Sequence, residues 1–454
     1  MIYQGEPGRD ALVCADERLT FAELRERVDA ASRDLNSLDS GVVILDARSD
    51  PATVVQFMAL LQLGKPAAMF SSTWTDHEIE VRRSMLGKSI HLDAAGDVVW
   101  TSPSREIAHH PEAAVVLFTS GSTGAPRAVQ LSRRNIDANT RAVLDTLDFE
   151  QASEQTLFLQ LSYSYGLLGQ LVPAIEVGVT TRLLPRFTDA RIVLETTQAR
   201  GMWSGVASHW EALLRLTDPP PENTAGITHI ISAGAPLSVD LRARLRDRFS
   251  NATLYNNYGQ TEAGPRVLSF SSRHPLFFDG YVGYPVGDFE VDVTDEDELL
   301  LRGSQVMPGY LGDVQATAEK IIDGWLYTGD MARIADDGLV EILGRRDQLV
   351  KVGGERISLR EVEEELSTWA EIDEAAVFVE VDELYGNRLV GFLVGGEPLR
   401  SLGRRQVIDT LAQRLSWHKV PRKFYLLDAL PRRPNGKIAR LELPLMKSTE
   451  RELS

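Results

Sequence analysis

The residues most capable of chemistry lie in a segment rich in glycine, serine and threonine at 117–132, which reads LFTSGSTGAPRAVQLS. Two glycines allow the backbone to approach an anion closely, and four hydroxyl groups with free N–H groups can surround a polyphosphate. The spacing GxxxxGK[ST] of a Walker loop is absent. This composition is also typical of an ordinary loop, so the segment alone indicates a phosphate site without establishing one.

This loop is the first of five segments that resemble, in the same order, the adenylate-forming superfamily of acyl-CoA synthetases, aryl-CoA ligases, peptide-synthetase adenylation domains and luciferases. The others are YNNYGQTEAG (255–264), LLLRGSQVMPGYLGD (299–313), the stretch 323–366 and LPRRPNGKIAR (430–440). One such match could arise by chance, whereas five in order indicate membership. The part before residue 117 resembles the family more weakly, and the chain is short for it.

The resemblance implies a reaction in two halves. A carboxylic acid and ATP give an acyl-AMP and pyrophosphate, and the acyl group then passes to a thiol with release of AMP. The implied cofactors are ATP, Mg²⁺ and a thiol, either CoA or the phosphopantetheine of an acyl or peptidyl carrier protein. Two alternatives stay open: an adenylation enzyme that loads a carrier protein, and, from a different class, a non-catalytic nucleotide-binding interaction module.

Carried over residue by residue, the resemblance implies a nucleotide site. Tyr258 is expected to stack on adenine, Thr261 to contact the α-phosphate, and Glu262 to hold Mg²⁺, which prefers carboxylate and phosphate oxygens. Asp330 is expected to accept both ribose hydroxyls because a carboxylate has two acceptor oxygens, and Arg345 to reach the ribose or the phosphates. The remaining nucleotide-binding residues are Thr119, Ser120, Gly121, Ser122, Thr123, Gly124, Arg127, Gly234, Ala235 and Gly259.

Two lysines are each expected to serve one half-reaction. Lys437 follows a Pro-Asn-Gly turn and matches the family lysine, a point charge that stabilises the attack of the carboxylate on the α-phosphate. Lys351, with Gly353 and Gly354, matches the loop that lines the thiol channel after the small domain rotates about a hinge at Asp347. The expected catalytic residues are Lys437, Lys351, Glu262 and Thr261. Arg127 stands where the family usually has lysine, and it keeps the charge.

The acid pocket is expected in the segment LSYSYGLLGQ (161–170). It supplies Tyr163, Ser164, Tyr165 and Gly166, and His209 is a further candidate. The segment lacks the aspartate that pairs with an α-ammonium group, and an unpaired buried ammonium is costly. Because it resembles the aryl-CoA ligase version instead, we expect an aryl or other non-amino carboxylic acid.

The elements that must position these residues alternate along the first part of the chain, which indicates βαβ units and parallel sheet. Helices are expected at 19–35 and 51–64, strands at 41–47, 66–70, 113–119, 156–162 and 227–233, and a β-meander around an acidic turn at 288–302. A helix at 358–366 and strands at 375–381 and 388–394 indicate a small α+β domain. The expected fold is α/β: a large N-terminal domain (1–346) of stacked sheets and helices, and a small mobile α+β C-terminal domain (347–454).

Composition limits the other classes of function. The 454 residues exceed one ordinary core, and the formal net charge of −17 should repel nucleic acid and anionic membranes. Cys14 is the only cysteine, which excludes an intramolecular disulfide and a cysteine-based zinc site. No apolar run of about eighteen residues and no signal-peptide pattern occurs. These features together predict a cytoplasmic protein.

Overall fold

The computed structural model describes residues 4–15, 17–38, 41–102, 107–120, 126–345, 349–353, 355–382, 386–431, 438, 442–447 and 451–453. The chain divides into two compact units. The first consists of Met1–Ser72, Arg83–Phe118 and Ala128–Arg346, and the second of Thr73–Arg82, Thr119–Arg127 and Asp347–Ser454. In the described part of the chain, no helix is long and apolar enough to cross a membrane.

A nine-stranded sheet of the first unit has the order β15-β14-β13-β12-β11-β9-β10-β1-β2. Its strands are β1 (Asp10–Cys14), β2 (Glu17–Thr20), β9 (Glu154–Leu157), β10 (Thr180–Leu183), β11 (Arg200–Gly205), β12 (Gly226–Ala233), β13 (Thr253–Tyr258), β14 (Leu268–Ser271) and β15 (Tyr284–Pro285). Six adjacent strands of this sheet run parallel, in the order β13, β12, β11, β9, β10 and β1. Their carboxyl ends therefore meet at one edge of the sheet.

The strand expected at 156–162 is wrong in its extent, because β9 ends at Leu157. The sequence stays apolar beyond this end because Leu159 and Leu161 are also buried in the core, although they belong to no strand. The chain then enters a short helix, α5 (Ser164–Gly166), and one π-helical turn, η2 (Leu167–Leu171). An apolar run therefore indicated burial here without indicating strand pairing.

A seven-stranded sheet has the order β18-β8-β7-β4-β3-β5-β6. Its strands are β3 (Val42–Asp46), β4 (Ala67–Phe70), β5 (Ser89–Leu92), β6 (Val98–Thr101), β7 (Ala113–Ser120), β8 (Pro126–Ser132) and β18 (Gly309–Tyr310). β3 is parallel to β4 and β5, and β4 is parallel to β7. The parallel βαβ arrangement expected from the alternation is confirmed.

A five-stranded antiparallel sheet follows along the chain. Its strands are β16 (Glu290–Val293), β17 (Glu298–Arg302), β19 (Ile321–Ile322), β20 (Trp325–Ile334) and β21 (Val340–Arg345). β16 and β17 form a hairpin in which Asp297 has a left-handed φ of 61°, so the acidic turn expected in this region is confirmed.

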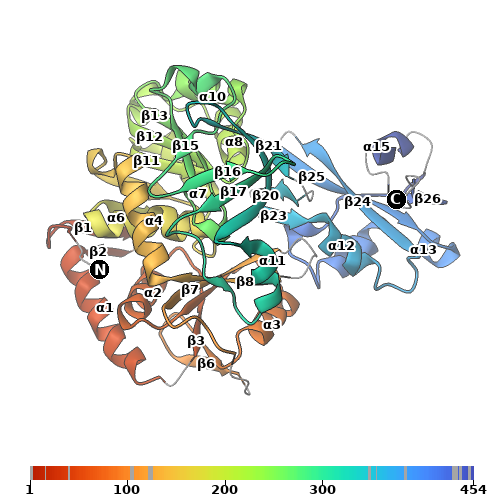
Figure 1. The fold of residues 1–454 in the computed structure, drawn as a ribbon, viewed down its shortest axis with the longest axis horizontal. Helices are drawn as coiled ribbons and strands as arrows, with labels where there is room; N and C mark the ends of the chain where they lie inside the picture. Colours follow the sequence, from red (N-terminus) through yellow and green to blue (C-terminus); the bar gives the residue numbers. More distant parts are fainter. Residues whose placement is uncertain are drawn as a thin grey trace. The chain divides into compact units, whose positions relative to one another are not determined.

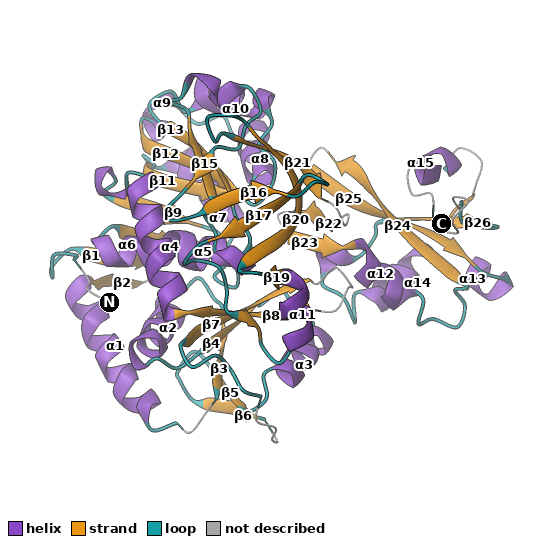
Figure 2. Cartoon of the chain, in the orientation of Figure 1, coloured by secondary structure: helices purple, strands orange, loops and turns teal. Residues whose placement is uncertain are grey.

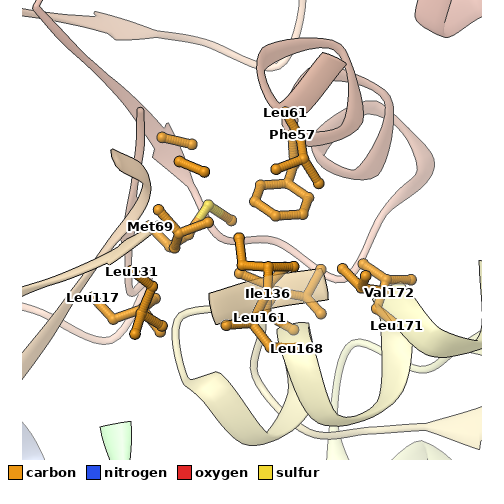
Figure 3. Close-up of a cluster of buried hydrophobic side chains, with 14 of the residues drawn as sticks. Phe57, Leu61, Met69, Leu117, Leu131, Ile136, Leu161, Leu168, Leu171 and Val172 are labelled. Atoms are coloured by element: carbon orange, nitrogen blue, oxygen red, sulfur yellow. The ribbon is translucent and has the colours of Figure 1, made fainter. Parts of the chain in front are cut away.

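Helices of the first unit cover these sheets, as Figures 1 and 2 show. Asp50 caps the start of α2 and Gly64, with φ 68°, ends it. In Figure 3, side chains of α2, β4, β7, β8 and α4 meet those of η2 and α6 in one core. The helices are α1 (Phe21–Asn36), α2 (Pro51–Leu63), α4 (Arg133–Thr146), α6 (Val172–Val177), α7 (Phe187–Thr196), α8 (Ala207–Leu216), α9 (Pro221–Thr224), α10 (Val239–Arg248) and α11 (Val314–Lys320), with 3₁₀ turns η1 (Phe149–Gln151), η3 (Thr261–Ala263) and η4 (Pro275–Phe278).

The second unit is α+β, and its C-terminal part is blue in Figure 1. A hairpin of β22 and β23 precedes a four-stranded sheet of order β24-β25-β26-β27, and an apolar core packs α12 and α14 against it. The elements are β22 (Leu349–Val352), β23 (Glu355–Ser358), α12 (Leu359–Leu366), β24 (Glu374–Asp382), β25 (Gly386–Val394), α13 (Glu397–Ser401), α14 (Arg404–Leu411), η5 (Trp417–Lys419), β26 (Lys423–Leu427), α15 (Leu443–Met446) and β27 (Arg451–Glu452).

A buried ion cluster lies within the second unit. The Lys419 ammonium donates to Glu78 at 2.9 Å and to Glu361 at 2.8 Å. Glu78 comes from α3 (Asp76–Met85), and its other oxygen accepts from the Ser416 hydroxyl at 2.5 Å. Burial raises the pKa of the Glu78 carboxyl, but Lys419 and the hydrogen bonds outweigh it and hold this pKa at about 2.

Candidate active site

Tyr258 and Asp330 meet in the first unit although 72 residues separate them. Tyr258 ends β13, and its hydroxyl donates to Oδ2 of Asp330 at 2.6 Å. Asp330 lies on β20, is 6 % exposed, and has Arg345 as its cross-strand neighbour on β21. The structure therefore brings together three residues that the sequence assigned to one nucleotide.

The chain turns sharply after Tyr258. A Cβ on Gly259 would lie 2.4 Å from the carbonyl of Pro265, so glycine is required for this close approach. Thr261 then begins the 3₁₀ turn η3, and Glu262 in that turn is buried.

Glu262 has one carboxylate oxygen available for a ligand. Its Oε1 accepts from the Tyr310 hydroxyl at 3.1 Å, whereas Oε2 has no hydrogen-bond partner in the described residues. A buried carboxylate oxygen without a donor fits a hard cation such as Mg²⁺. No group of three or more His, Cys, Asp or Glu side chains that could hold a metal occurs in the described part of the chain.

The turn after β12 lies at the same edge of the sheet. Gly234 and Ala235 follow Ala233, which is the register partner of Asn257 on β13. Gly234 has φ 81°, a left-handed conformation that favours glycine. Both residues therefore lie near the end of the strand that carries Tyr258.

The structure describes some of the other expected site residues and leaves the rest outside its described part. The roles of both groups stay predictions. Thr119 and Ser120 end β7 and Arg127 is the second residue of β8. Lys351 lies on β22, and Gly353 follows that strand with φ 59°. The residues outside the described part are Gly121, Ser122, Thr123, Gly124, Asp347, Gly354 and Lys437.

The segment expected to form the acid pocket is helical. Tyr163 precedes α5, which contains Ser164, Tyr165 and Gly166. The Tyr165 hydroxyl donates to the carbonyl of Ile231 at 2.8 Å, which fixes the ring at the end of β12. Burial raises the pKa of Tyr165 to about 12, so this phenol is neutral at physiological pH.

His209 packs against aromatic rings. Its imidazole stacks on Phe187 at 4.7 Å and meets Phe158 edge-on at 5.3 Å. The Nδ1 atom accepts from the N–H of Val206 at 3.3 Å. Burial lowers the pKa of His209 to about 4, so the ring is neutral. These contacts account for the residue as a packing element, and its contact with the acid stays a prediction.

Arg266 was not among the site residues predicted from the sequence. It lies two residues after the segment YGQTEAG. Arg266 is 1 % exposed, and its Cζ lies 4.5 Å from the centroid of the Tyr165 ring. Its Nη1 donates to the carbonyl of Pro265 at 3.0 Å, while Nε and Nη2 have no hydrogen-bond partner among the described residues. The sequence offered one sign that Arg266 is buried, because this charged residue stands directly before the apolar residues Val267 and Leu268.

Two family models match the sequence. One, described as AMP-binding enzyme, matches residues 82–311, and the other, described as AMP-binding enzyme C-terminal domain, matches residues 361–437. The 2-succinylbenzoate–CoA ligase of Listeria monocytogenes is 26 % identical over 458 residues, with 96 % of each chain covered. The 4-coumarate–CoA ligase 3 of Oryza sativa is 26 % identical over 483 residues, with 94 % of this chain and 87 % of the rice protein covered.

Solved structures share the fold. The o-succinylbenzoate CoA synthetase of Bacillus subtilis, bound to a product analogue, aligns with a TM-score of 0.83 at 24 % identity and covers 99 % of this chain and 97 % of its own. A malonyl-CoA ligase with methylmalonyl-CoA and AMP aligns with a TM-score of 0.77 at 27 % identity, covering 94 % and 97 %. The expected α/β fold with a smaller C-terminal domain is thereby confirmed.

Proposed function

Because the chain belongs to the AMP-binding enzyme family, we propose that it converts an aryl or other non-amino carboxylic acid into its CoA thioester through an acyl-AMP. The enzyme class is acid–thiol ligase, with ATP and CoA as co-substrates. The observation that carries the nucleotide half is the Tyr258–Asp330 hydrogen bond beside the buried Glu262 turn. The relatives named for 2-succinylbenzoate and 4-coumarate support the choice of acid and of CoA.

In the first half-reaction, a carboxylate oxygen of the acid bonds to the α-phosphorus of ATP, and the bond to pyrophosphate breaks. Asp330 accepts the ribose hydroxyls, and Tyr258 orients that carboxylate while its ring contacts adenine. Glu262 would hold Mg²⁺, which neutralises phosphate charge when it is bound. Lys437 places a positive charge between the two substrates.

In the second half-reaction, the thiol releases its proton to solvent and its sulfur bonds to the acyl carbon, and AMP leaves with the electron pair of the broken C–O bond. Lys351 and Gly353 of the second unit line the path of the thiol after the unit rotates about Asp347. CoA is the proposed acceptor. A phosphopantetheine on a carrier protein is the alternative acceptor within the same chemistry.

The pocket favours an acid without an α-ammonium group. The segment 161–170 contains no carboxylate, and Tyr165 is a neutral phenol. An α-amino acid would therefore bury its ammonium without a counter-charge.

The net charge of −17 supports partners other than nucleic acid, and the single Cys14 supports a reducing, cytoplasmic setting.

Pyrophosphate release over a panel of acids tests the proposal. We expect acid-dependent release with aryl acids, and thioester formation when CoA is added. Matched pairs such as benzoate and phenylglycine, or propionate and alanine, should favour the member without the amino group. Consistent preference for the amino acid would refute the pocket assignment. AMP binding without release for any acid would instead favour the non-catalytic module, and thioester formation only with a carrier protein would change the acceptor.

A further inference from the structure

Two arginines of the first unit are almost completely buried, and their guanidinium groups differ in hydrogen bonding. Arg242 on α10, 2 % exposed, donates to three backbone carbonyl oxygens, one from each nitrogen. Arg266 donates from Nη1 to the carbonyl of its neighbour Pro265 at 3.0 Å and interacts with the phenol of Tyr165. The Nε and Nη2 groups of Arg266 have no hydrogen-bond partner in the described part of the chain. Arg242 is thus a satisfied structural group, whereas Arg266 has donors that nothing in the described protein uses.

The positive charge of Arg266 also lacks a counter-charge. No described carboxylate lies within ion-pair distance of it, and the group that faces it is the ring of Tyr165 at 4.5 Å. Burial lowers the pKa of the guanidinium. A buried charge without a partner is strongly unfavourable. Its position is therefore best explained by an anion that binds there from outside the chain.

The location of Arg266 identifies where such an anion would bind. The side chain lies against α5 and η2, the segment expected to hold the acid. A Cβ on Gly169 of η2 would be 3.1 Å from Pro265 and 3.4 Å from Nη1 of Arg266, so η2 packs closely against both residues. Arg266 also follows Glu262 by only four residues. Arg266 thus lies against the segment proposed to hold the acid, and it is close in sequence to the proposed Mg²⁺ ligand.

We propose that Arg266 binds a second carboxylate of the acid, so that the preferred substrates are dicarboxylic acids. The two unused donors, Nε and Nη2, lie on one edge of the planar guanidinium, and this edge matches both oxygens of a carboxylate. The carboxylate held by Arg266 is the one that does not react, while the other attacks the α-phosphorus. This proposal rests on the proposed function and narrows its substrate class.

The test compares dicarboxylic acids, aliphatic and aromatic, with their own monomethyl esters, which keep the reacting carboxylate and lose the second charge. The readout is kcat/KM in ATP–pyrophosphate exchange. The wild-type protein should prefer each accepted diacid over its ester. Arg266→Met should lower kcat/KM for the best diacid by roughly 10²–10⁴, the scale for losing two charge-assisted hydrogen bonds, and change that for the ester by less than about threefold. Arg266→Lys, which keeps the charge without the paired donors, should recover part of the preference.

Arg242→Met is the matched control, since it removes an equally buried arginine away from the unused donors. It should lower thermal stability and leave the ratio of diacid to ester activity unchanged. AMP binding by calorimetry reports whether each variant is folded. If Arg266→Met loses activity equally on diacids and esters, or if the wild-type protein does not prefer diacids, the role of Arg266 is refuted while the ligase function stands. Absence of exchange with every diacid, ester and monoacid refutes the ligase function itself, and the role of Arg266 with it.

Discussion

Replacing Lys419 by methionine should destabilise the second unit strongly. The Lys419 ammonium lies between the carboxylates of Glu78 and Glu361, and the side chains of Lys419 and Glu78 are 6 % and 4 % exposed. The substitution leaves two carboxylates partly or fully buried without their cation, a change that costs about 3–5 kcal/mol. The shift of the Glu78 pKa from 4.5 to about 2 gives a similar figure of about 3 kcal/mol.

The same pKa shift sets the pH dependence of this contribution. The folded-state pKa of Glu78 lies below its unfolded value, so the stabilisation is fully present above pH 4.5 and is lost as the pH falls toward 2. The difference in free energy of unfolding between the wild-type protein and Glu78→Gln should therefore shrink over this interval.

The loss of stability in Lys419→Met is measured by urea unfolding at pH 7. Hydrogen exchange of peptides that cover α14 and β26 monitors the unfolding of the second unit. Arg405→Met is the matched control, because the Arg405–Asp409 pair has side chains that are 95 % and 65 % exposed and should contribute little. Equal urea midpoints for Lys419→Met and the wild-type protein would show that the cluster does not stabilise the unit. A difference between wild type and Glu78→Gln that stays constant from pH 4.5 to pH 2 would refute the assignment of the low pKa.

Three further outcomes are expected. Asp330→Ala should raise the apparent KM for ATP by roughly 10–10² per lost ribose hydrogen bond and reduce discrimination against deoxy-ATP, and an ATP dependence like that of the wild type would leave Asp330 as a turn residue. Lys437→Ala should slow adenylation by roughly 10²–10³ and spare thioester formation from preformed acyl-AMP, with the reverse for Lys351→Ala; equal losses in both halves would exclude the division of roles. Burial lowers the pKa of His209 and His229 from 6.5 to about 4, so the unfolded chain binds more protons and stability should fall as pH drops from 6.5 to 4; unfolding curves that do not change over this interval would contradict it.

Local structure could be predicted from the sequence because short-range chemistry determines it. Asp50 and Gly64 set the two ends of α2 through a cap and a left-handed residue. The segment YGQTEAG contains the glycine that its own tight turn requires, and the order of five such segments identified the family. These signals lie within a few residues of one another, so they need no knowledge of the fold.

The extent of β9 could not be predicted in this way. Its end at Leu157 depends on pairing with β10 and β11, which come later in the chain. Hydrophobicity indicates only that residues are buried, and Leu159 and Leu161 are buried without pairing.

The sequence by itself determined the reaction class and predicted the nucleotide-binding residues, because their motifs are local. Only the tertiary structure decided which distant groups meet. Lys419 and Glu78 are 341 positions apart, and nothing near either residue indicates a buried pair. Arg266 likewise reads as an ordinary charge before an apolar strand. Its burial against Tyr165, with two donors unused, follows from the packing of η2 against the turn after β13, and such packing energies depend on the whole fold.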